Sequence, residues 1–180
     1  MTGLNKTKLN RRKLITTGII GAGAYGIARF TGIFGTGVVA ESSARTGKPF
    51  TITHSPAEWK KQLGSARYRI LRDAGTERAF SSPLNKEKRK GIFACAGCNL
   101  GLYSSETKFD SGTGWPSFWE SLPRAIGTKP DRSFFVVRTE VHCRRCGGHF
   151  GHIFDDGPPP TGKRHCLNGA ALKFVPGEAA

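Results

Sequence analysis

Four of the five cysteines in this chain stand in two close pairs, and these pairs constrain the fold more than any other feature. Cys95 and Cys98 form one pair, and Cys143 and Cys146 form the other. Two residues between the thiols let both sulfurs of a pair turn toward one ion, and two such pairs complete the tetrahedral sulfur site that suits Zn²⁺. Because four ligands leave no open coordination position, the sequence predicts a structural zinc ion.

Disulfide bonds, or a redox-active Cys-x-x-C pair, are the alternative use of the same four thiols in an exported protein. A redox pair needs only two cysteines and usually opens a helix. Here there are two pairs, and each lies at the end of a predicted strand. These differences favour the zinc site over the redox alternative.

The rest of the pattern indicates a mainly β (α+β) domain. The chain has 24 glycines and 10 prolines, which favour turns, and 12 Phe and 3 Trp, which can fill a core. Ser55, Pro56 and Glu58 have the spacing of a capping box at the start of a short helix, and a second helix over 66–75 is expected to stop at Gly75. Strands are predicted over 91–95, 133–143, 151–154 and 170–176.

The first 48 residues have the layout of an export signal. A basic start over 6–13 precedes an apolar run over 14–28, and small residues at 38–44 suit a signal peptidase. The pair Arg11 and Arg12 resembles a twin-arginine signal. The apolar run is short for a membrane-spanning helix, which needs about 20 residues.

These features divide the chain into three parts. We expect residues 1–48 to be an export signal and linker, 49–177 to be the folded domain, and 178–180 to be a loose tail. The expected location is the periplasm, and the alternative is an uncleaved anchor in the inner membrane with the domain facing the periplasm.

The net charge of +15 does not by itself identify a partner. The first 48 residues hold eight Lys and Arg residues and one acidic residue, so much of the charge belongs to the predicted signal. A basic domain can bind nucleic acid or anionic lipid, but a solvated positive surface is the simpler interpretation.

The fifth cysteine, Cys166, has no near cysteine partner in the sequence and lies beside Arg164 and Asn168. On a strand these three side chains share a face, where the guanidinium favours the thiolate and the amide can donate to a substrate oxygen. His149 and His152 would face opposite ways on a regular strand, but a turn at the glycine between them can bring them together. A cysteine close to a histidine is the usual arrangement for nucleophilic catalysis by a thiolate.

The stretches "CAGC", "FDSGTGWPSF", "CRRCGGHFGHIFDDGP" and "TGKRHCLNGAALKF", in this order, resemble the B-type methionine sulfoxide reductases, the peptide-methionine (R)-S-oxide reductases. The resemblance covers about 55–176 and rests on four separate motifs. It implies a core of two antiparallel sheets with short helices packed outside. It also implies reduction of methionine (R)-sulfoxide, free or in proteins, and hence repair of oxidised exported proteins.

The resemblance implies a role for each matching residue. Cys166 matches the nucleophile that attacks the sulfoxide sulfur and becomes a sulfenic acid. His149 and His152 match the pair that binds and protonates the sulfoxide oxygen, with help from Asn168. The other matches are Trp115 with the residue that packs against the substrate methyl group, Arg164 with the arginine that supports the thiolate, and Cys95, Cys98, Cys143 and Cys146 with the ligands of one structural Zn²⁺.

The chain departs from the family pattern at Thr113, where many relatives have a cysteine that resolves the sulfenic acid through a disulfide. The remaining cysteines match zinc ligands. We therefore expect an external thiol to reduce Cys166, supplied by a thioredoxin-like protein, a glutaredoxin-like protein or a small molecule. The expected partners are that reductant and oxidised proteins or peptides, with no nucleic acid, and the expected oligomeric state is a monomer.

Two function classes other than a sulfoxide reductase would also use part of this pattern. A zinc-ribbon binding module explains the four paired cysteines and the basic charge, but it leaves Cys166, the two histidines and the Gly-Trp turn without a role. A thiol–disulfide oxidoreductase would use one of the Cys-x-x-C pairs as its reactive pair.

Overall fold

The computed structural model describes residues 50–133 and 136–177 of the 180-residue chain. The predicted export signal and the loose tail lie outside the described residues. Within the described ranges, no helix is both long enough and apolar enough to cross a membrane.

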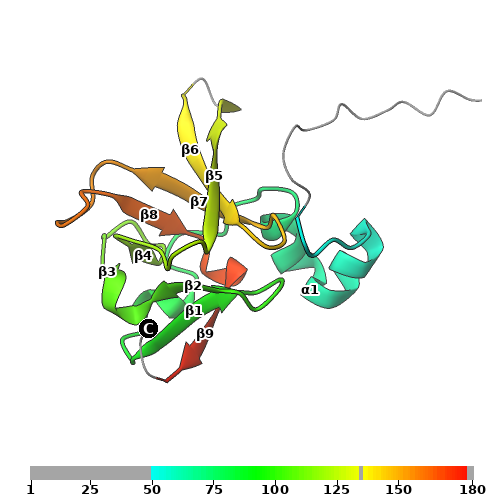
Figure 1. Ribbon diagram of the computed structural model, residues 1–180, viewed down its shortest axis with the longest axis horizontal. Coiled ribbons are helices and arrows are strands. Elements are labelled where there is room, and N and C mark those ends of the chain that lie inside the picture. The colour runs from blue at the N-terminus through cyan, green and yellow to red at the C-terminus, as the bar shows by residue number, and fades with distance from the viewer. Residues whose placement is uncertain (1–49, 134–135, 178–180) are drawn as a thin grey trace, which may run out of the picture. The chain divides into compact units, whose positions relative to one another are not determined.

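The described chain forms two antiparallel sheets with one α-helix beside them (Figure 1), which confirms the predicted fold class. The three-stranded sheet has the order β2-β1-β9, and the six-stranded sheet has the order β3-β4-β8-β7-β6-β5. The elements are α1 (Pro56–Leu71), β1 (Gly91–Cys95), β2 (Gly101–Ser104), β3 (Lys108–Phe109), β4 (Ser117–Phe118), β5 (Ile126–Asp131), β6 (Arg138–Cys143), β7 (His149–Phe154), β8 (Arg164–Leu167) and β9 (Leu172–Pro176), with short 3₁₀ turns η1 (Pro83–Lys86), η2 (Ser105–Thr107) and η4 (Gly169–Ala171).

Helix α1 combines the two predicted helices into one broken element. Its start is as expected, since Ser55 and Glu58 form the capping box. The break is at Gly64, where φ is 70° and ψ is 165°. The helix ends at Leu71, earlier than predicted, and Ala74 takes a left-handed φ of 51° before Gly75.

The two sheets share an aromatic core. Phe93 on β1 and Tyr103 on β2 meet Phe118 on β4, with ring centroids 4.9 Å and 4.5 Å apart. All three side chains are completely buried. Aromatic pairs at these separations add to the free energy gained by burying their area, so this cluster fixes β4, and with it the neighbouring strand β8, against the smaller sheet.

Strand β6 begins at Arg138, five residues later than the sequence pattern predicts. The Asp131 side chain accepts hydrogen bonds from the Ser133 backbone N–H and hydroxyl at 3.0 Å and 2.7 Å. An aspartate that bonds to the backbone two residues on forms an Asx turn, which ends β5 and delays the next strand. Asp131 is thereby held at the end of β5.

A β-bulge separates the two histidines of β7. Val141 on β6 pairs with Gly151, and the next residue, His142, pairs with His149, so Phe150 is the extra residue. A single extra residue reverses the alternation of side chains along the strand. His149 and His152 therefore meet on one side of the sheet, with ring centroids 5.6 Å apart.

Gly151 brings β7 close to β8. Its φ is +155°, and a Cβ built there would lie 2.1 Å from the Cys166 carbonyl oxygen. The Cβ would therefore force the two strands apart at the point where His152 faces Cys166.

We predict that Gly151→Ala lowers the free energy of unfolding by about 3 kcal/mol or more, because the clash is with backbone and cannot be relieved by a side-chain rotation. Denaturant unfolding followed by circular dichroism measures this change. Gly162→Ala is the matched control, since Gly162 has a φ of +68° with nothing within 4 Å of the added Cβ. Gly162→Ala should lower the free energy of unfolding by about 1–2 kcal/mol, the strain of a single left-handed residue. Equal losses in the two variants would contradict the close-approach argument.

Candidate active site and metal centre

The four paired cysteines converge, as the sequence predicts. Cys95 ends β1 and Cys98 lies in the turn that follows; Cys143 ends β6 and Cys146 lies in the turn that follows. The two turns have matching backbones: the carbonyl oxygens of Cys95 and Cys143 accept hydrogen bonds from the N–H groups of Asn99 and Gly147, both at 2.9 Å. Asn99 and Gly147 are left-handed, with φ of 58° and 71°, so residue types that tolerate this conformation follow each pair.

The four sulfurs have the arrangement of a tetrahedral metal site. Cys95 Sγ lies 3.7 Å from Cys146 Sγ, and Cys98 Sγ lies 3.5 Å from Cys143 Sγ, so each cysteine approaches one from the other pair. All four lie within 4.8 Å of one another, and none forms a disulfide. Sulfurs bound about 2.3 Å from one zinc ion in a tetrahedron would stand about 3.8 Å apart. The cluster can therefore hold a metal ion.

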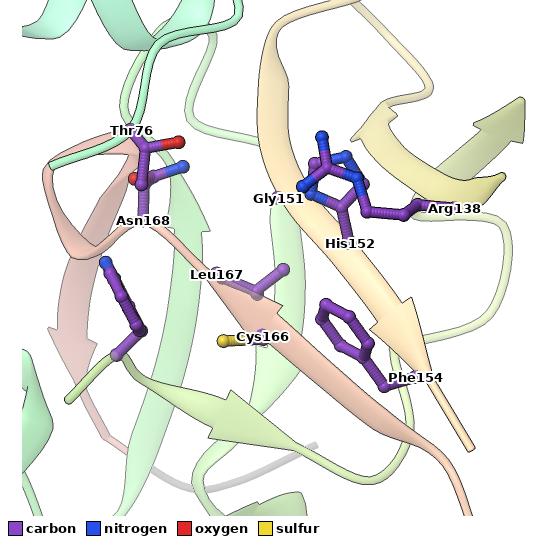
Figure 2. Close-up of a pocket in the computed structure, with 9 residues that line it drawn as sticks. Thr76, Arg138, Gly151, His152, Phe154, Cys166, Leu167 and Asn168 are labelled. Atoms are coloured by element: carbon purple, nitrogen blue, oxygen red, sulfur yellow. The ribbon is translucent and has the colours of Figure 1, made fainter. Parts of the chain in front are cut away.

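A separate small pocket surrounds Cys166 on β8 (Figure 2). Its volume is about 150 Å³, and it is lined by Thr76, Trp115, Arg138, Gly151, His152, Phe154, Cys166, Leu167 and Asn168. Cys166 pairs with His152 on β7 and with Ser117 on β4, so it occupies the middle strand of three. Directly opposed residues on antiparallel strands have Cβ atoms about 5 Å apart. The sheet register therefore places an imidazole beside a partly exposed thiol.

Each histidine of β7 lies beside a carboxylate from another strand of the same sheet, Asp131 on β5 or Glu140 on β6. His152 Nε2 lies 2.8 Å from Asp131 Oδ2, and His149 Nδ1 lies 3.1 Å from Glu140 Oε1. Asp131 Oδ2 also accepts from Arg138 Nη2 at 2.7 Å. His149 is buried and does not line the pocket, so His152 is the histidine that faces Cys166.

Burial lowers the pKa of His152, although the hydrogen bond to Asp131 opposes this shift; the charges of Arg138 and His149 lower it further. Hydrogen bonds from Ser133, then from His152 and Arg138, hold the pKa of the Asp131 carboxyl well below its usual value. Asp131 is therefore ionised at neutral pH. It accepts the proton on Nε2 of the neutral ring, which leaves Nδ1 as the basic nitrogen.

Arg164 lies two residues before Cys166 on β8, a strand that the sequence pattern did not predict. Its guanidinium donates to both carboxylate oxygens of Asp156, from Nε at 2.8 Å and from Nη2 at 2.9 Å. It also stacks over the Phe154 ring, 4.4 Å from the centroid. These contacts fix a buried positive charge that interacts with the Cys166 sulfur.

Asn168 differs from the sequence expectation. Its Oδ1 accepts from the Glu77 N–H at 2.8 Å, and its Nδ2 donates to the Phe150 carbonyl at 2.9 Å. A second, longer bond from Nδ2 reaches the Gly75 carbonyl at 3.5 Å. The amide that was expected to donate to a substrate oxygen is committed to the backbone of neighbouring segments, although Asn168 does line the pocket.

The sequence reasoning missed Glu77, which holds the pocket wall together. Its carboxylate accepts from the N–H groups of Gly169 and Ala170 at 2.6 Å and 2.9 Å, and its carbonyl accepts from Trp115 Nε1 at 3.2 Å. Glu77 lies in a polar stretch without periodicity, so nothing in the sequence pattern distinguished it. Asp131 and Glu140, which lie beside the histidines, were also missed, because their proximity to the histidines depends on pairing between strands.

Thr113 stands beside the nucleophile candidate. Its Oγ1 lies 3.8 Å from Cys166 Sγ and 2.8 Å from the Ser111 hydroxyl, which in turn lies 2.8 Å from the buried Ser117 hydroxyl. A chain of three hydroxyl groups thus ends at the Cys166 sulfur. No other cysteine approaches the Cys166 sulfur, because the other four cysteines are grouped in the cluster that can hold a metal ion.

Comparison with known proteins agrees with this arrangement. Residues 63–176 match the SelR domain. A peptide methionine sulfoxide reductase MsrB of Methanosarcina barkeri is 51% identical over 124 residues, which cover 68% of this chain and 87% of that protein. An MsrB of Agrobacterium fabrum is 48% identical over 126 residues, which cover 69% of this chain and 93% of that protein. The chloroplastic peptide methionine sulfoxide reductase B1 of Arabidopsis thaliana is 52% identical over 121 residues, which cover 67% of this chain and 60% of that protein.

The matching region contains the metal-binding cluster and every residue of the pocket. Its similarity extends over most of the length of the bacterial and archaeal relatives. The chain therefore belongs to the MsrB family of peptide methionine sulfoxide reductases, oxidoreductases that act on a sulfur group.

Proposed function

We propose that this protein reduces the R epimer of methionine sulfoxide, free or in polypeptides, with Cys166 as the nucleophile. The observation that carries the proposal is the cross-strand pair of Cys166 and His152 inside a small pocket. The pocket is large enough for the end of one side chain, and it combines a thiol, an imidazole and an indole.

The reaction needs an acid opposite the nucleophile, because a sulfoxide is a poor electrophile until its oxygen is protonated. The Cys166 thiol passes its proton to Nδ1 of His152, the basic nitrogen of the neutral ring. The thiolate then attacks the sulfoxide sulfur while the imidazolium gives that proton to the oxygen. The sulfur–oxygen bond of the substrate breaks, the oxygen passes to Cys166, and methionine leaves. Two electrons move from the cysteine sulfur to the substrate sulfur, which leaves Cys166 as a sulfenic acid.

Trp115 supports the selection of one epimer. Its indole lines the pocket and its Nε1–H is bound to the Glu77 carbonyl, so the ring is fixed. A fixed apolar wall that receives the methyl group leaves only one orientation in which the oxygen can face His152.

Two further side chains support the reaction. The His149 ring packs beside the His152 ring and helps to position it. The positive charge of Arg164 stabilises the Cys166 thiolate.

We infer that the metal is Zn²⁺ and that it is structural. Four thiolate donors in a tetrahedron suit zinc, and the cluster leaves no position open for a substrate. Bound there, zinc would cross-link the turns after β1 and β6.

We also propose that an external thiol, from a thioredoxin-like protein, a glutaredoxin-like protein or a small molecule, reduces the sulfenic acid, since Thr113 occupies the flank of Cys166. The proposed export to the periplasm, and with it the repair of oxidised exported proteins, rests on the sequence of residues 1–48. An inner-membrane anchor is the alternative for the same segment.

The test of the main proposal is a steady-state assay on peptides that carry either epimer of methionine sulfoxide, with dithiothreitol as reductant. We expect turnover of the R epimer only, and Cys166→Ser should lose it by several orders of magnitude while keeping the melting temperature and the bound metal. The serine variant keeps the shape of the site but lacks the nucleophile. Retained turnover in this variant, or turnover of the S epimer alone, would be incompatible with the proposed mechanism.

Thr113→Cys should convert the enzyme to internal resolution. A sulfur at the Thr113 Oγ1 position starts 3.8 Å from Cys166 Sγ, and Gly112 and Gly114 on either side let the turn adjust to a disulfide of about 2.05 Å. After one turnover without reductant, mass spectrometry should find an intramolecular disulfide in the variant and a sulfenic acid, trapped by dimedone, in the parent. Ser111→Cys is the control, because the Ser111 hydroxyl bonds to the hydroxyls of Thr113 and Ser117, whereas Thr113 is the residue whose hydroxyl contacts the Cys166 sulfur. A disulfide in the parent protein would overturn the proposal of an external reductant.

Asp131→Asn should move the alkaline limb of the kcat–pH profile to lower pH. The Asp131 carboxylate raises the pKa of His152, so its removal lowers that pKa further and the proton on His152 is lost at lower pH. Asp155→Asn is the control, since Asp155 is an exposed acid that pairs with Lys163. An alkaline limb that stayed in place or moved upward would show that His152 is not the acid.

A further inference from the structure

Phe80 combines two unfavourable features at the edge of the candidate active site. Its side chain is 74% exposed, the largest value among the large hydrophobic side chains that the structure describes. Its φ is 63°, a left-handed conformation that bulky residues rarely adopt. Strain of this kind persists where the surrounding structure imposes it, and such positions cluster at functional sites.

The strained backbone of Phe80 is attached to the turn that carries Trp115. The Phe80 N–H donates to the Gly114 carbonyl at 2.7 Å, and Asn85 Nδ2 donates to the same oxygen at 2.8 Å. A Cβ at Gly114 would lie 2.8 Å from Phe80 N and 2.9 Å from Phe80 Cδ2. The ring of Phe80 therefore lies directly against Gly114 while most of its surface faces solvent.

The segment that ends at Phe80 runs along the wall of the pocket. Thr76 lines the pocket itself, and the Glu77 carbonyl holds the Trp115 indole. Phe80 then holds Gly114, the residue before Trp115. One short segment thus positions the apolar wall and, next to it, presents an exposed aromatic ring.

A polypeptide substrate must extend beyond the pocket. A volume of about 150 Å³ accepts the end of one side chain, so the residues on either side of the methionine sulfoxide lie on the rim. The Phe80 ring exposes apolar surface that carries no charge and no hydrogen-bonding group. An apolar side chain of the substrate, next to the methionine sulfoxide, would bury this surface and so gain free energy of binding.

We propose that Phe80 is the docking contact for an apolar residue that flanks the methionine sulfoxide in a polypeptide substrate. This inference rests on the proposed function. It assigns to the enzyme a preference for oxidised methionines in apolar sequence contexts, which become accessible when a protein unfolds. Phe80 acts on binding of the polypeptide and not on the chemistry at Cys166.

The experiment compares three substrates of the R epimer: N-acetyl methionine sulfoxide, a peptide with leucine on both sides of the oxidised methionine, and a peptide with serine on both sides. The variant is Phe80→Asn, because asparagine tolerates the left-handed conformation and removes only the ring. Phe80→Trp tests whether another aromatic ring preserves the contact. Val175→Thr on β9, in the smaller sheet, is the control for loss of an exposed apolar side chain.

We expect Phe80→Asn to lower kcat/KM for the leucine-flanked peptide about tenfold, mainly through KM, and to leave the acetylated amino acid within about twofold. Phe80→Trp and Val175→Thr should keep the parental preference. An equal loss on all three substrates would assign Phe80 a purely structural role, and no loss on any would remove it from substrate binding; either result overturns the inference. Failure of the proposed function has a different signature, since the parent protein would then reduce none of the three substrates.

Discussion

The close approach of β7 to β8 at Gly151 is the constraint on which the candidate active site depends. Only a residue without a Cβ fits against the Cys166 carbonyl, and the extra residue Phe150 just before it reverses the direction of the following side chains. The approach places His152 opposite Cys166, and the bulge brings His149 to the same side. Without both features, a regular strand would turn the two histidines to opposite faces of the sheet.

The cluster of four cysteines can supply a second constraint, away from the pocket around Cys166. Cys95 ends a strand of the three-stranded sheet, and Cys143 ends a strand of the six-stranded sheet. An ion bound by both pairs would join the sheets at one end, while the cluster of Phe93, Tyr103 and Phe118 joins them through the core. Strand β8 pairs on one side with β4, which carries Phe118 of the aromatic cluster. On its other side it pairs with β7, which in turn pairs with β6, the strand that ends at Cys143.

Charged groups around the pocket are arranged in pairs that leave the reactive atoms available. Asp131 and Glu140 hold the two imidazoles, Asp156 holds Arg164, and Glu77 uses its carboxylate on backbone N–H groups. Partly buried charges cost free energy unless they are paired, and here each pair also fixes the direction of a functional side chain. The thiol of Cys166 is left with hydroxyl and imidazole neighbours and no cysteine, a geometry that supports the proposed regeneration by an external thiol.

Local spacing and residue type were enough to predict the β-rich class, the capped start of α1, the strand at 91–95 and the grouping of four cysteines. They also predicted a strand over 170–176, of which the first two residues belong to a 3₁₀ turn and the rest form β9. The sequence also singled out Cys166, Trp115 and the histidines as a set. Tertiary structure alone decided how they meet. The bulge at Phe150 and the register between β7 and β8 depend on pairing across strands, and the anchoring of Asn168 by Glu77 joins residues 91 positions apart. No pattern along one stretch of chain contains such information, because hydrogen-bond partners far apart in sequence are chosen only when the whole domain packs.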